Sequence, residues 1–284
     1  DFDPPSGAAE TDMTADYGPW NTSLMLATSE DGLTFTHTDT VITDQADVPE
    51  LVLDDNGWLY LYYTGWTIGD VDNLTAVAIS DDNGETWTFK NLELSGFEDL
   101  SSAVDPDVQL LDDGTFRLFL TADPNDGDGP RTHYAESTDG VNFELVGVAF
   151  EQAGENVLDP STLLIEDIWH FFAGGSGGNW HATSEDGESF EYYDTEEFEI
   201  DGSTYMMANG ILTDDGIYRF YAFSNGNDDI RSFTTTDGYE WTADDDARLE
   251  VDEDSELESD FVKDPAVIQL EDGSYLMVYT TAIP

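Results

Sequence analysis

The sequence contains no cysteine and very few basic residues, and each absence excludes a class of protein. Without cysteine the chain has neither a disulfide framework nor a thiolate metal site. Seven lysines and arginines stand against 64 acidic residues, so little is available to neutralise phosphates, and no nucleic acid partner is expected. No apolar run approaches the roughly 20 residues that a membrane-spanning helix needs, so no membrane span is expected.

The acidic residues give the 284-residue chain a formal net charge of -57, yet 39% of its residues are hydrophobic and 13% are aromatic. A disordered acidic tail lacks such an apolar content, so the acids must cover a folded core. This composition is typical of proteins adapted to molar salt, where like charges are screened over a Debye length of roughly 3 Å. We therefore expect a salt-adapted protein from a halophile. The alternative is an acidic protein that works at low salt.

The chain begins at Asp1 with an acidic lead over residues 1–19 that contains proline, glycine and alanine. It has no initiator methionine and no apolar signal core, which favours a processed and exported protein. We therefore expect the protein to be extracellular or located at the cell surface. Residues 20–284 are expected to form a single domain.

A short turn motif recurs five times, with about 50 residues between copies. Each copy places a Ser or Thr before Asp and Gly, and an aromatic residue follows. The copies are SEDGLTF (29–35), SDDNGETW (80–87), STDGVNF (137–143), SEDGESF (184–190) and TTDGYEW (235–241). The aspartate bonds its own backbone and the glycine supplies a positive φ, so each copy predicts a tight hairpin turn followed by an aromatic that packs between sheets.

A second repeated segment runs in phase with the first and predicts two strands joined by a turn. Its copies cover residues 47–65, 105–122, 159–175, 208–224 and 264–281. Alternation such as Phe116, Leu118 and Leu120 has the period of two expected for strands. The two motifs together predict an all-β protein, a five-bladed β-propeller of four-stranded antiparallel blades. Residues 264–281 supply only half a blade, so the N-terminal strands over 21–35 are expected to close it.

Acidic residues open four of the five predicted inner strands, at Asp47, Asp105, Asp159 and Asp264, while the remaining strand carries Asn209. The meander brings these strand starts to one face, where the carboxyls should crowd at the mouth of an axial funnel. Crowding drives their pKa values apart, as a division into acid and base requires. One alternative is that each aspartate only turns the chain. Another is that Asp105, Asp159 and Asp264 hold a structural Ca²⁺ or Na⁺ ion, although no cofactor is required.

Loops predicted at the same face carry aromatic and polar groups suited to a sugar. Tryptophan rings stack on sugars, and Arg, His or Asn side chains bind hydroxyls or carboxylates. The candidate contacts are Trp66, Arg131, His133, Trp180, His181, Asn209 and Arg231. The alternative for each tryptophan is packing between blades.

The repeated Asp-Pro and Asp-Gly units resemble the five-bladed propeller glycoside hydrolases of families 43, 32, 62 and 130. The segment SDDNGETW (80–87) is also similar to the Asp box of sialidases, a turn motif that is structural in that family. The resemblance covers nearly the whole chain after residue 20. It implies a glycan substrate and catalysis by three acids on successive blades.

The resemblance permits two assignments of these acids. In families 43 and 32 the acid usually sits two residues before a proline, and a pKa-modulating aspartate sits directly before one. Lys263-Asp264-Pro265 resembles the modulator, and Asp47 matches the acid position with Asp in place of Glu, which leaves the blade of Asn209 without a base. A linear assignment instead makes Asp47, Asp105 and Asp159 the base, modulator and acid.

Two other functions compete with glycoside hydrolysis. A non-catalytic carbohydrate-binding or cell-surface structural propeller has the same repeats and needs no catalytic pair. Sialidase chemistry needs three arginines for the substrate carboxylate, and a chain with five arginines over five blades supplies them poorly.

Removing salt at neutral pH should lower the melting temperature, because the acidic surface repels itself when the charges are no longer screened. Thermal unfolding followed by circular dichroism at about 3 M and about 0.1 M KCl measures this effect. A melting temperature that is the same at both concentrations would contradict the expected salt adaptation.

Overall fold

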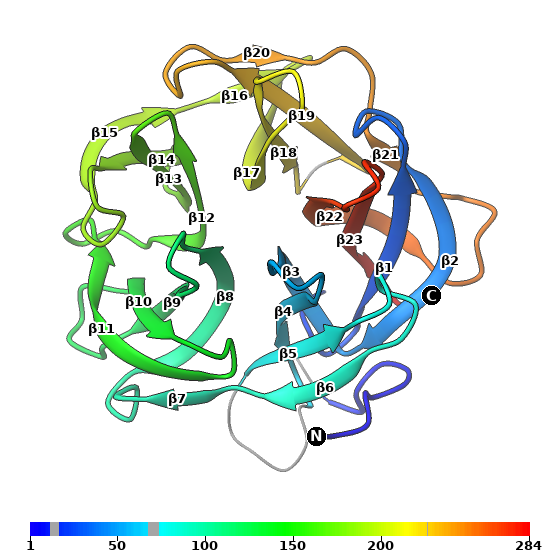
Figure 1. Cartoon of the computed structure of the whole chain (residues 1–284), viewed down its shortest axis with the longest axis horizontal. Helices are drawn as coiled ribbons and strands as arrows, with labels where there is room; N and C mark the ends of the chain where they lie inside the picture. Colours follow the sequence, from blue (N-terminus) through cyan, green and yellow to red (C-terminus); the bar gives the residue numbers. More distant parts are fainter. Residues whose placement is uncertain (12–16, 68–73, 226) are drawn as a thin grey trace.

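The computed structural model describes residues 1–11, 17–67, 74–225 and 227–284 of the chain. Five small antiparallel sheets surround one axis, which confirms the predicted five-bladed β-propeller (Figure 1). The innermost strands of neighbouring blades contact one another all the way around the axis. Within the described ranges, no helix is long and apolar enough to cross a membrane.

The first blade joins the two ends of the chain. Strand β1 (Thr22–Ser29) pairs antiparallel with β23 (Tyr275–Ala282), and the full sheet order is β2–β1–β23–β22. The other two strands are the outer β2 (Thr36–Asp44) and the inner β22 (Ser259–Gln269). The prediction that N-terminal strands complete the last blade is therefore confirmed, although the outer strand lies beyond the predicted range 21–35.

Blades 2 and 4 are the four-stranded meanders that the repeats predict. Blade 2 consists of β3 (Ala46–Leu53), β4 (Leu59–Gly65), β5 (Thr75–Ser80) and β6 (Thr88–Asn91). Blade 4 consists of β12 (Leu158–Ile165), β13 (Ile168–Gly175), β14 (Gly178–Ser184) and β15 (Glu191–Glu196). In both blades the strands pair in chain order from the axis outward.

Blades 3 and 5 contain more strands than predicted. Blade 3 has β8 (Ser101–Leu110), β9 (Phe116–Asp123), β10 (Arg131–Ser137) and β11 (Asn142–Phe150), and β7 (Glu93–Ser95) pairs parallel with β11. Blade 5 has β17 (Ser203–Leu212), β18 (Tyr218–Phe223) and β19 (Asp229–Thr235), with the short strands β16 (Phe198–Ile200), β20 (Thr242–Ala243) and β21 (Leu249–Glu250). Strands β7 and β16 lie in connections between blades, where no repeat predicts them, whereas β20 and β21 both pair with β19 in the place of the predicted fourth strand.

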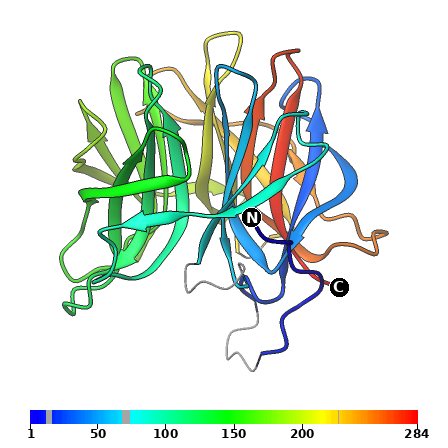
Figure 2. The same cartoon turned by 60° about the horizontal axis from the view of Figure 1, so that its bottom comes forward.

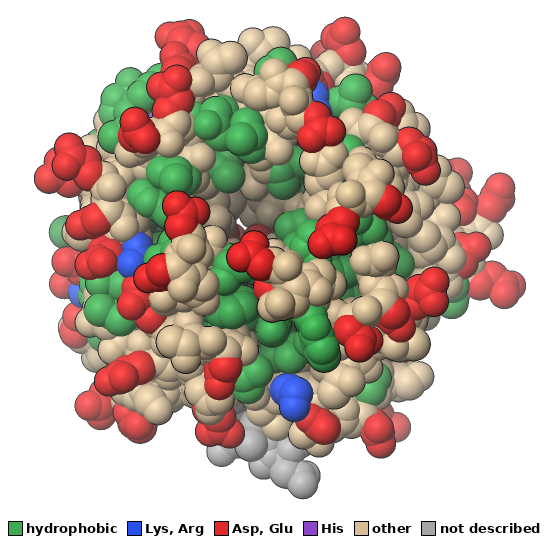
Figure 3. Space-filling model, in the orientation of Figure 1, with side chains coloured by type: hydrophobic (Ala, Val, Ile, Leu, Met, Phe, Trp, Pro, Cys, Tyr) green, Lys and Arg blue, Asp and Glu red, His purple; other side chains and the backbone are tan. Residues whose placement is uncertain are grey.

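The two ends of the propeller differ. The hairpins β3–β4, β17–β18 and β22–β23 project at one end, which we call the hairpin face, and the C-terminus lies toward the other end (Figure 2). Figures 1 and 3 look onto the hairpin face. There, acidic side chains are numerous at the periphery, and hydrophobic side chains together with some acidic ones surround a central hollow (Figure 3). The N-terminal lead contacts blade 2 through Phe2, which pairs with Phe89, and residues 12–16 of that lead lie outside the described part.

The five recurring turns have the structure that their sequence predicts. In the first, the Ser29 Oγ accepts a hydrogen bond from the Gly32 N–H at 3.0 Å, and Asp31 Oδ1 accepts one from the Leu33 N–H at 2.8 Å. Gly32 has a φ of 67°, and the four equivalent glycines also have positive φ. Aromatic residues then pack between blades, so each turn holds one blade against the next.

Buried tyrosine hydroxyls link some of these turns to the preceding blade. The fully buried Tyr62 of blade 2 donates its hydroxyl hydrogen to the Gly140 carbonyl of blade 3 at 2.8 Å. Tyr221 of blade 5 makes the equivalent 2.8 Å bond to Gly32 of blade 1. Phe119 and Phe172 occupy the matching positions in blades 3 and 4. The core therefore lies between the blades, and a buried tyrosine hydroxyl bonds the recurring turn where blade 2 meets blade 3 and where blade 5 meets blade 1.

Replacing Tyr62 with phenylalanine should lower the free energy of unfolding by about 1 to 2 kcal/mol, because the Gly140 carbonyl loses its buried donor. Urea unfolding at fixed salt measures the change. Tyr192→Phe is the matched control, since the Tyr192 hydroxyl makes an exposed hydrogen bond with Thr195 of the same strand. Equal stabilities of the two variants would contradict a structural role for the Tyr62 bond.

Candidate functional site

Each innermost strand carries a bulge at the same height in the propeller. The pairing register shifts between Val104 and Asp107 in β8 and between Lys263 and Ala266 in β22, and β3, β12 and β17 shift at the matching places. In four of the five bulges a proline supplies no N–H to the ladder, which a bulge tolerates. A bulge re-aims the side chains beside it, so all five strands can direct residues toward the axis.

Three aspartates occupy the same backbone position in these bulges. Asp105, Asp159 and Asp264 each precede proline and have φ values of 55°, 52° and 47°. Few residues other than glycine adopt a positive φ, and aspartate is among those that tolerate it best. The sequence of these bulges therefore fixes both the backbone turn and the place of the carboxyl.

Two details of the sequence prediction are wrong here. The Asp-Pro pairs do not start their strands in blades 1 and 3, because Asp264 and Asp105 lie well inside β22 and β8. The bulge absorbs the proline, so pairing continues on both sides of it. Asp47 is also not equivalent to the other three, since Val48 has the positive φ in β3 and Asp47 occupies the position of Lys263 in β22.

The structure nevertheless brings the four predicted aspartates together with one lysine. We call Asp47, Asp105, Asp159, Lys263 and Asp264 the axial cluster. Asp47 and Asp264 are 6% and 4% exposed, while Asp105 and Asp159 keep partial access to solvent. The Lys263 Nζ lies 2.8 Å from the Asp264 Oδ2, so this pair is ionic.

Burial and mutual repulsion raise the pKa values of several carboxyls in the cluster. Burial, with repulsion from Asp264 and Asp159, raises the pKa of Asp47 to about 7, against the opposing charge of Lys263. Burial and Asp47 likewise raise the pKa of Asp105 to about 7. Burial and the neighbouring carboxyl of Asp105 raise the pKa of Asp159 well above its usual range. At neutral pH the cluster therefore holds protonated and ionised carboxyls side by side.

Lys263 is the counter-charge of the cluster. Burial alone would lower the pKa of its ammonium, but the carboxylates of Asp264 and Asp47 raise it above its ordinary value. The lysine therefore stays protonated and places one positive charge inside the cluster.

Threonines of the preceding blades hold two of the aspartate backbones. The Asp105 N–H donates to the Thr64 Oγ1 at 2.9 Å, and the Asp159 N–H donates to the Thr121 Oγ1 at 3.2 Å. The Thr121 side chain and the Asp159 backbone also act on the Asp105 carboxyl, and both lower its pKa by hydrogen bonding. These hydrogen bonds stabilise the ionised carboxyl of Asp105 more than that of Asp159.

A second, deeper group of buried carboxyls was missed by the sequence reasoning. Glu50 and Asp107 are 4% and 2% exposed, and the Thr162 hydroxyl donates to the Asp107 Oδ2 at 2.6 Å. Burial raises the pKa of Asp107 to about 7, and burial together with Asp107 raises that of Glu50. The available signal was their position, since each directly follows the proline of a bulge.

Asn209 belongs to this deeper group. Its predicted contact with a sugar is not supported, because both ends of its side-chain amide already bond protein groups. Its Nδ2 donates to Glu50 at 3.1 Å, and its Oδ1 accepts the Val267 N–H at 2.9 Å. The side chain is 5% exposed. Asn209 therefore positions Glu50 and ties blade 5 to blades 1 and 2.

The predicted loop residues are dispersed rather than gathered at the axis. Arg131 pairs with Asp126 at 2.7 Å and with Glu151 at 2.5 Å, and Arg231 pairs with its neighbour Asp229. Both guanidiniums are therefore held by carboxylates of their own blades. Arg131 and Arg231 lie in strands β10 and β19, not in loops.

The aromatic and histidine candidates also pack within the blades. His133 in β10 is 5% exposed, and His181 in β14 is fully buried with its Nε2 2.9 Å from the His170 Nδ1. Trp180, also in β14, donates its indole N–H to the Asn156 carbonyl at 3.1 Å. Their predicted loop placement is wrong because the third strands begin earlier than expected. Trp66 packs edge to face on Trp20, with ring centroids 5.5 Å apart, and residues 68–73 of its loop lie outside the described part.

A cavity of about 490 Å³ opens beside the axial cluster between blades 4 and 5. Asp159 forms part of its wall. The other lining residues that matter for binding are Asn156, Ser176, Met206, Phe223 and Asn225. A side chain at Gly174 would meet the Met206 Cε at 3.0 Å, so glycine keeps this wall recessed. The volume suits a small organic ligand with both polar and apolar surfaces.

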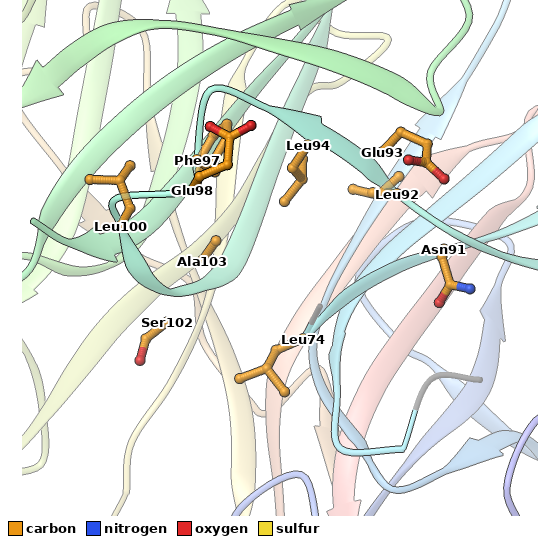
Figure 4. Close-up of a pocket in the computed structure, with 10 residues that line it drawn as sticks. All are labelled: Leu74, Asn91, Leu92, Glu93, Leu94, Phe97, Glu98, Leu100, Ser102 and Ala103. Atoms are coloured by element: carbon orange, nitrogen blue, oxygen red, sulfur yellow. The ribbon is translucent and has the colours of Figure 1, made fainter. Parts of the chain in front are cut away.

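A different cavity, of about 400 Å³, lies at the junction of blades 2 and 3 (Figure 4). Leu74, Leu92, Leu94, Phe97 and Leu100 line most of it, and none of the described residues around it belongs to the axial cluster. We assign no chemistry to this cavity.

No group of three or more His, Cys, Asp or Glu side chains is arranged to hold a metal ion within residues 1–11, 17–67, 74–225 and 227–284. The axial cation at Asp105, Asp159 and Asp264 remains a prediction.

Solved structures of carbohydrate-active proteins share this architecture. An α-L-arabinofuranosidase from Lactobacillus brevis matches with a TM-score of 0.65 at 11% identity, over 82% of this chain and 82% of the other. A thermostable family-43 glycoside hydrolase matches with a TM-score of 0.63 at 15% identity, over 83% and 88%. The fold is that of the five-bladed glycoside hydrolase propellers.

A further match shows how widely this propeller is used. An N-acetylgalactosamine deacetylase from F. plautii, solved with blood group B trisaccharide, has a TM-score of 0.62 at 15% identity, over 87% of this chain and 81% of the other. No protein-family model matches the sequence, and a comparison with curated proteins found no match. At these identities the likeness defines the glycoside hydrolase propeller fold, and the activity must be argued from the axial cluster.

Asp47→Asn should make the stability less dependent on pH. The folded-state pKa of Asp47 is about 7 and its ordinary value is 3.8, so its stabilising contribution is complete below about pH 4 and is lost as the pH rises through 7. Asparagine cannot ionise, so the variant should gain about 2 to 4 kcal/mol over the wild type between pH 4 and pH 8. Urea unfolding at fixed salt measures this difference. An unchanged pH slope would show that Asp47 ionises freely.

Proposed function

We propose that this protein is a glycoside hydrolase-like propeller that acts on a glycan through the axial cluster. The observation that carries the proposal is the convergence of four aspartates and one lysine from blades 1 to 4 at the axis. Two of these carboxyls, Asp47 and Asp105, have a pKa of about 7. Hydrolysis of a glycosidic bond requires one carboxyl that donates a proton and one that accepts or attacks.

Asp47 is the proposed general acid. It is buried and holds its proton near neutral pH, which an acid that protonates the leaving-group oxygen must do. It also stands two residues before Pro49, where the family 43 and 32 pattern places the acid. Aspartate is one methylene shorter than the glutamate of that pattern, so the scissile bond would lie closer to β3.

Asp105 is the proposed base or nucleophile. Its carboxyl receives hydrogen bonds from the Thr121 side chain and the Asp159 backbone, both of which favour the anion. In its anionic form it removes a proton from the attacking water or attacks the anomeric carbon itself, while Asp47 delivers its proton to the departing oxygen. The sum of either route is one water added across one glycosidic bond.

Lys263 and Asp264 are proposed to set the charge of the site. Both charges of the ion pair act on Asp47, where Lys263 lowers the pKa of the carboxyl and Asp264 raises it to a smaller extent, so the pair limits the rise that burial causes. The motif Lys263-Asp264-Pro265 also resembles the modulator of the hydrolase families. Its role is therefore to tune Asp47 rather than to react.

The cavity beside Asp159 is the proposed sugar subsite. Its volume of about 490 Å³ accommodates one or two sugar rings. Ser176, Asn156 and Asn225 offer groups that bind hydroxyls, and Phe223 and Met206 supply an apolar wall.

One observation favours the second candidate, a non-catalytic carbohydrate-binding propeller. The bulge of β17 carries Met207, Ala208 and Asn209, so blade 5 contributes no acid where the other blades do. The assignment that follows the ring of the hydrolase families places the base on that blade. A binding propeller would keep the funnel and the cavity without turnover.

We also propose that the protein is exported and works in high salt. Almost all of its lysines and arginines form ion pairs with carboxylates of the same chain. Lys90 pairs with Asp1, and Arg117 and Arg219 pair with carboxylates of the blade surfaces. What the described surface presents to solvent is therefore mainly carboxylate, which molar salt screens.

Aryl arabinosides, xylosides and fructosides assayed in about 3 M KCl should be hydrolysed by the wild type. Asp47→Asn and Asp105→Asn should each lower kcat by about 100- to 10,000-fold, because each removes one half of the proton transfer. Asp39→Asn is the control, since Asp39 has the same positive φ of 55° and is exposed.

No turnover by the folded wild type on any of these substrates would contradict catalysis and favour the binding propeller. Equal activity of the Asp47, Asp105 and Asp39 variants would show that the axial cluster is not the catalytic site.

A further inference from the structure

Two exposed tyrosines lie side by side on the outer part of the propeller, between blades 4 and 5. Tyr193 in β15 is 51% exposed, and Tyr239, in the turn before β20, is 38% exposed. Their ring centroids are 5.0 Å apart with an interplanar angle of 58°. Hydrophobic side chains also gather in the region of β15 in Figure 3, with acidic side chains on both sides.

Buried histidines fix the orientation of both rings. Tyr239 packs edge to face on His170 at 4.9 Å, and Tyr193 packs on His181 at 4.9 Å. The two imidazoles are fully buried and bonded to each other at 2.9 Å. The tyrosines therefore rest on a rigid base and present their outer surfaces to solvent without a change of conformation on binding.

A cavity of about 380 Å³ continues from Tyr239 along blade 4. Its lining is rich in hydroxyls and carboxylates. The lining residues are Ile168, Thr183, Ser184, Glu185, Asp186, Ser189, Glu191 and Tyr239. All but Tyr239 belong to the strands and the Asp-Gly turn of blade 4, and Tyr239 lies in the corresponding turn of blade 5, so the cavity lies toward the hairpin face.

The charges that line this cavity determine which class of ligand it can bind. Its ionisable lining groups, apart from the tyrosine, are all carboxylates, which repel phosphates and other anions. Arg117, which donates to the carbonyl of the lining residue Asp186 and to Glu136, is 5% exposed, so its charge is not presented to a ligand. Carboxylates accept hydrogen bonds from hydroxyls, and aromatic faces pack on the C–H faces of sugar rings.

We propose that the groove of Tyr193, Tyr239 and the 380 Å³ cavity is a second glycan site, which holds a neutral polysaccharide chain away from the axial cluster. The site anchors the polymer on the hairpin face and does not take part in hydrolysis. Only the choice of polymer rests on the proposed function, because the recognition chemistry requires no turnover.

The test measures binding of the folded protein to insoluble xylan and insoluble β-mannan by depletion in about 3 M KCl. Tyr193→Ala and Tyr239→Ala should each weaken binding by about five- to tenfold. Tyr192→Ala should leave it unchanged, because Tyr192 is 49% exposed in the same strand but packs on Trp180 instead. Turnover of a small aryl glycoside should be the same in all three variants.

Circular dichroism melts identify a variant that fails to fold, and the exposed Tyr193→Ala keeps the test valid if Tyr239→Ala does not fold. Binding that persists in Asp47→Asn and Asp105→Asn but falls in Tyr193→Ala supports the second site whether or not the wild type hydrolyses glycosides. The proposal is overturned if the wild type binds neither polymer, or if Tyr192→Ala weakens binding as much as Tyr193→Ala. It is also overturned if only the axial variants lose binding.

Discussion

Closure of the ring is the constraint on which the rest of the structure depends. A single twisted sheet of four strands has two apolar faces and cannot bury both alone, so each blade needs a neighbour on each side. The pairing of β1 with β23 gives the first blade its missing half and closes the ring. Closure forces five innermost strands around one axis, so any side chain repeated at one height on those strands meets its equivalents there.

The axial cluster is the chemical consequence of that geometry. Three Asp-Pro bulges and the Asp47 of β3 aim carboxyls at a common point, and their mutual repulsion adds to the cost of burial. One lysine is far too little charge to compensate for four aspartates, so the cluster retains protons that isolated aspartates would release. The same chain places most of its other carboxylates on the surface, where water and salt screen them.

The fold was predictable from the sequence because each blade is marked by short motifs that repeat along the chain. Each Asp-Gly turn and each Asp-Pro strand is recognisable within a few residues, and ring closure follows from a half unit at each end. The extra strands β7 and β16 were not predictable in this way, because they lie in connections that do not repeat and pair only through tertiary contacts. The repeats pointed to the four axial aspartates because each lies one or two residues before a proline of the repeated unit, although Asp105 and Asp264 lie inside their strands and Asp47 occupies a different bulge position.

The periphery of the site was not predictable, for a physical reason. Arg131 and Arg231 were expected to bind a glycan. In a chain with so many acidic residues, each instead forms an ion pair with a neighbouring carboxylate. His181 was expected in a loop, but the strand begins three residues before it and buries it against His170. Glu50 and Asp107 escaped notice because their position depends on the bulge, which shifts the side-chain alternation of the inner strand.

The central claim is that the axial carboxyls share protons at neutral pH, and a ¹³C NMR titration of the aspartate side-chain carboxyls in high salt tests it most directly. The account predicts that at least two aspartate signals titrate near pH 7 and that one of them disappears in Asp47→Asn. If every aspartate carboxyl of the folded protein titrated below about pH 5, the axial cluster would be fully ionised and the account would be wrong.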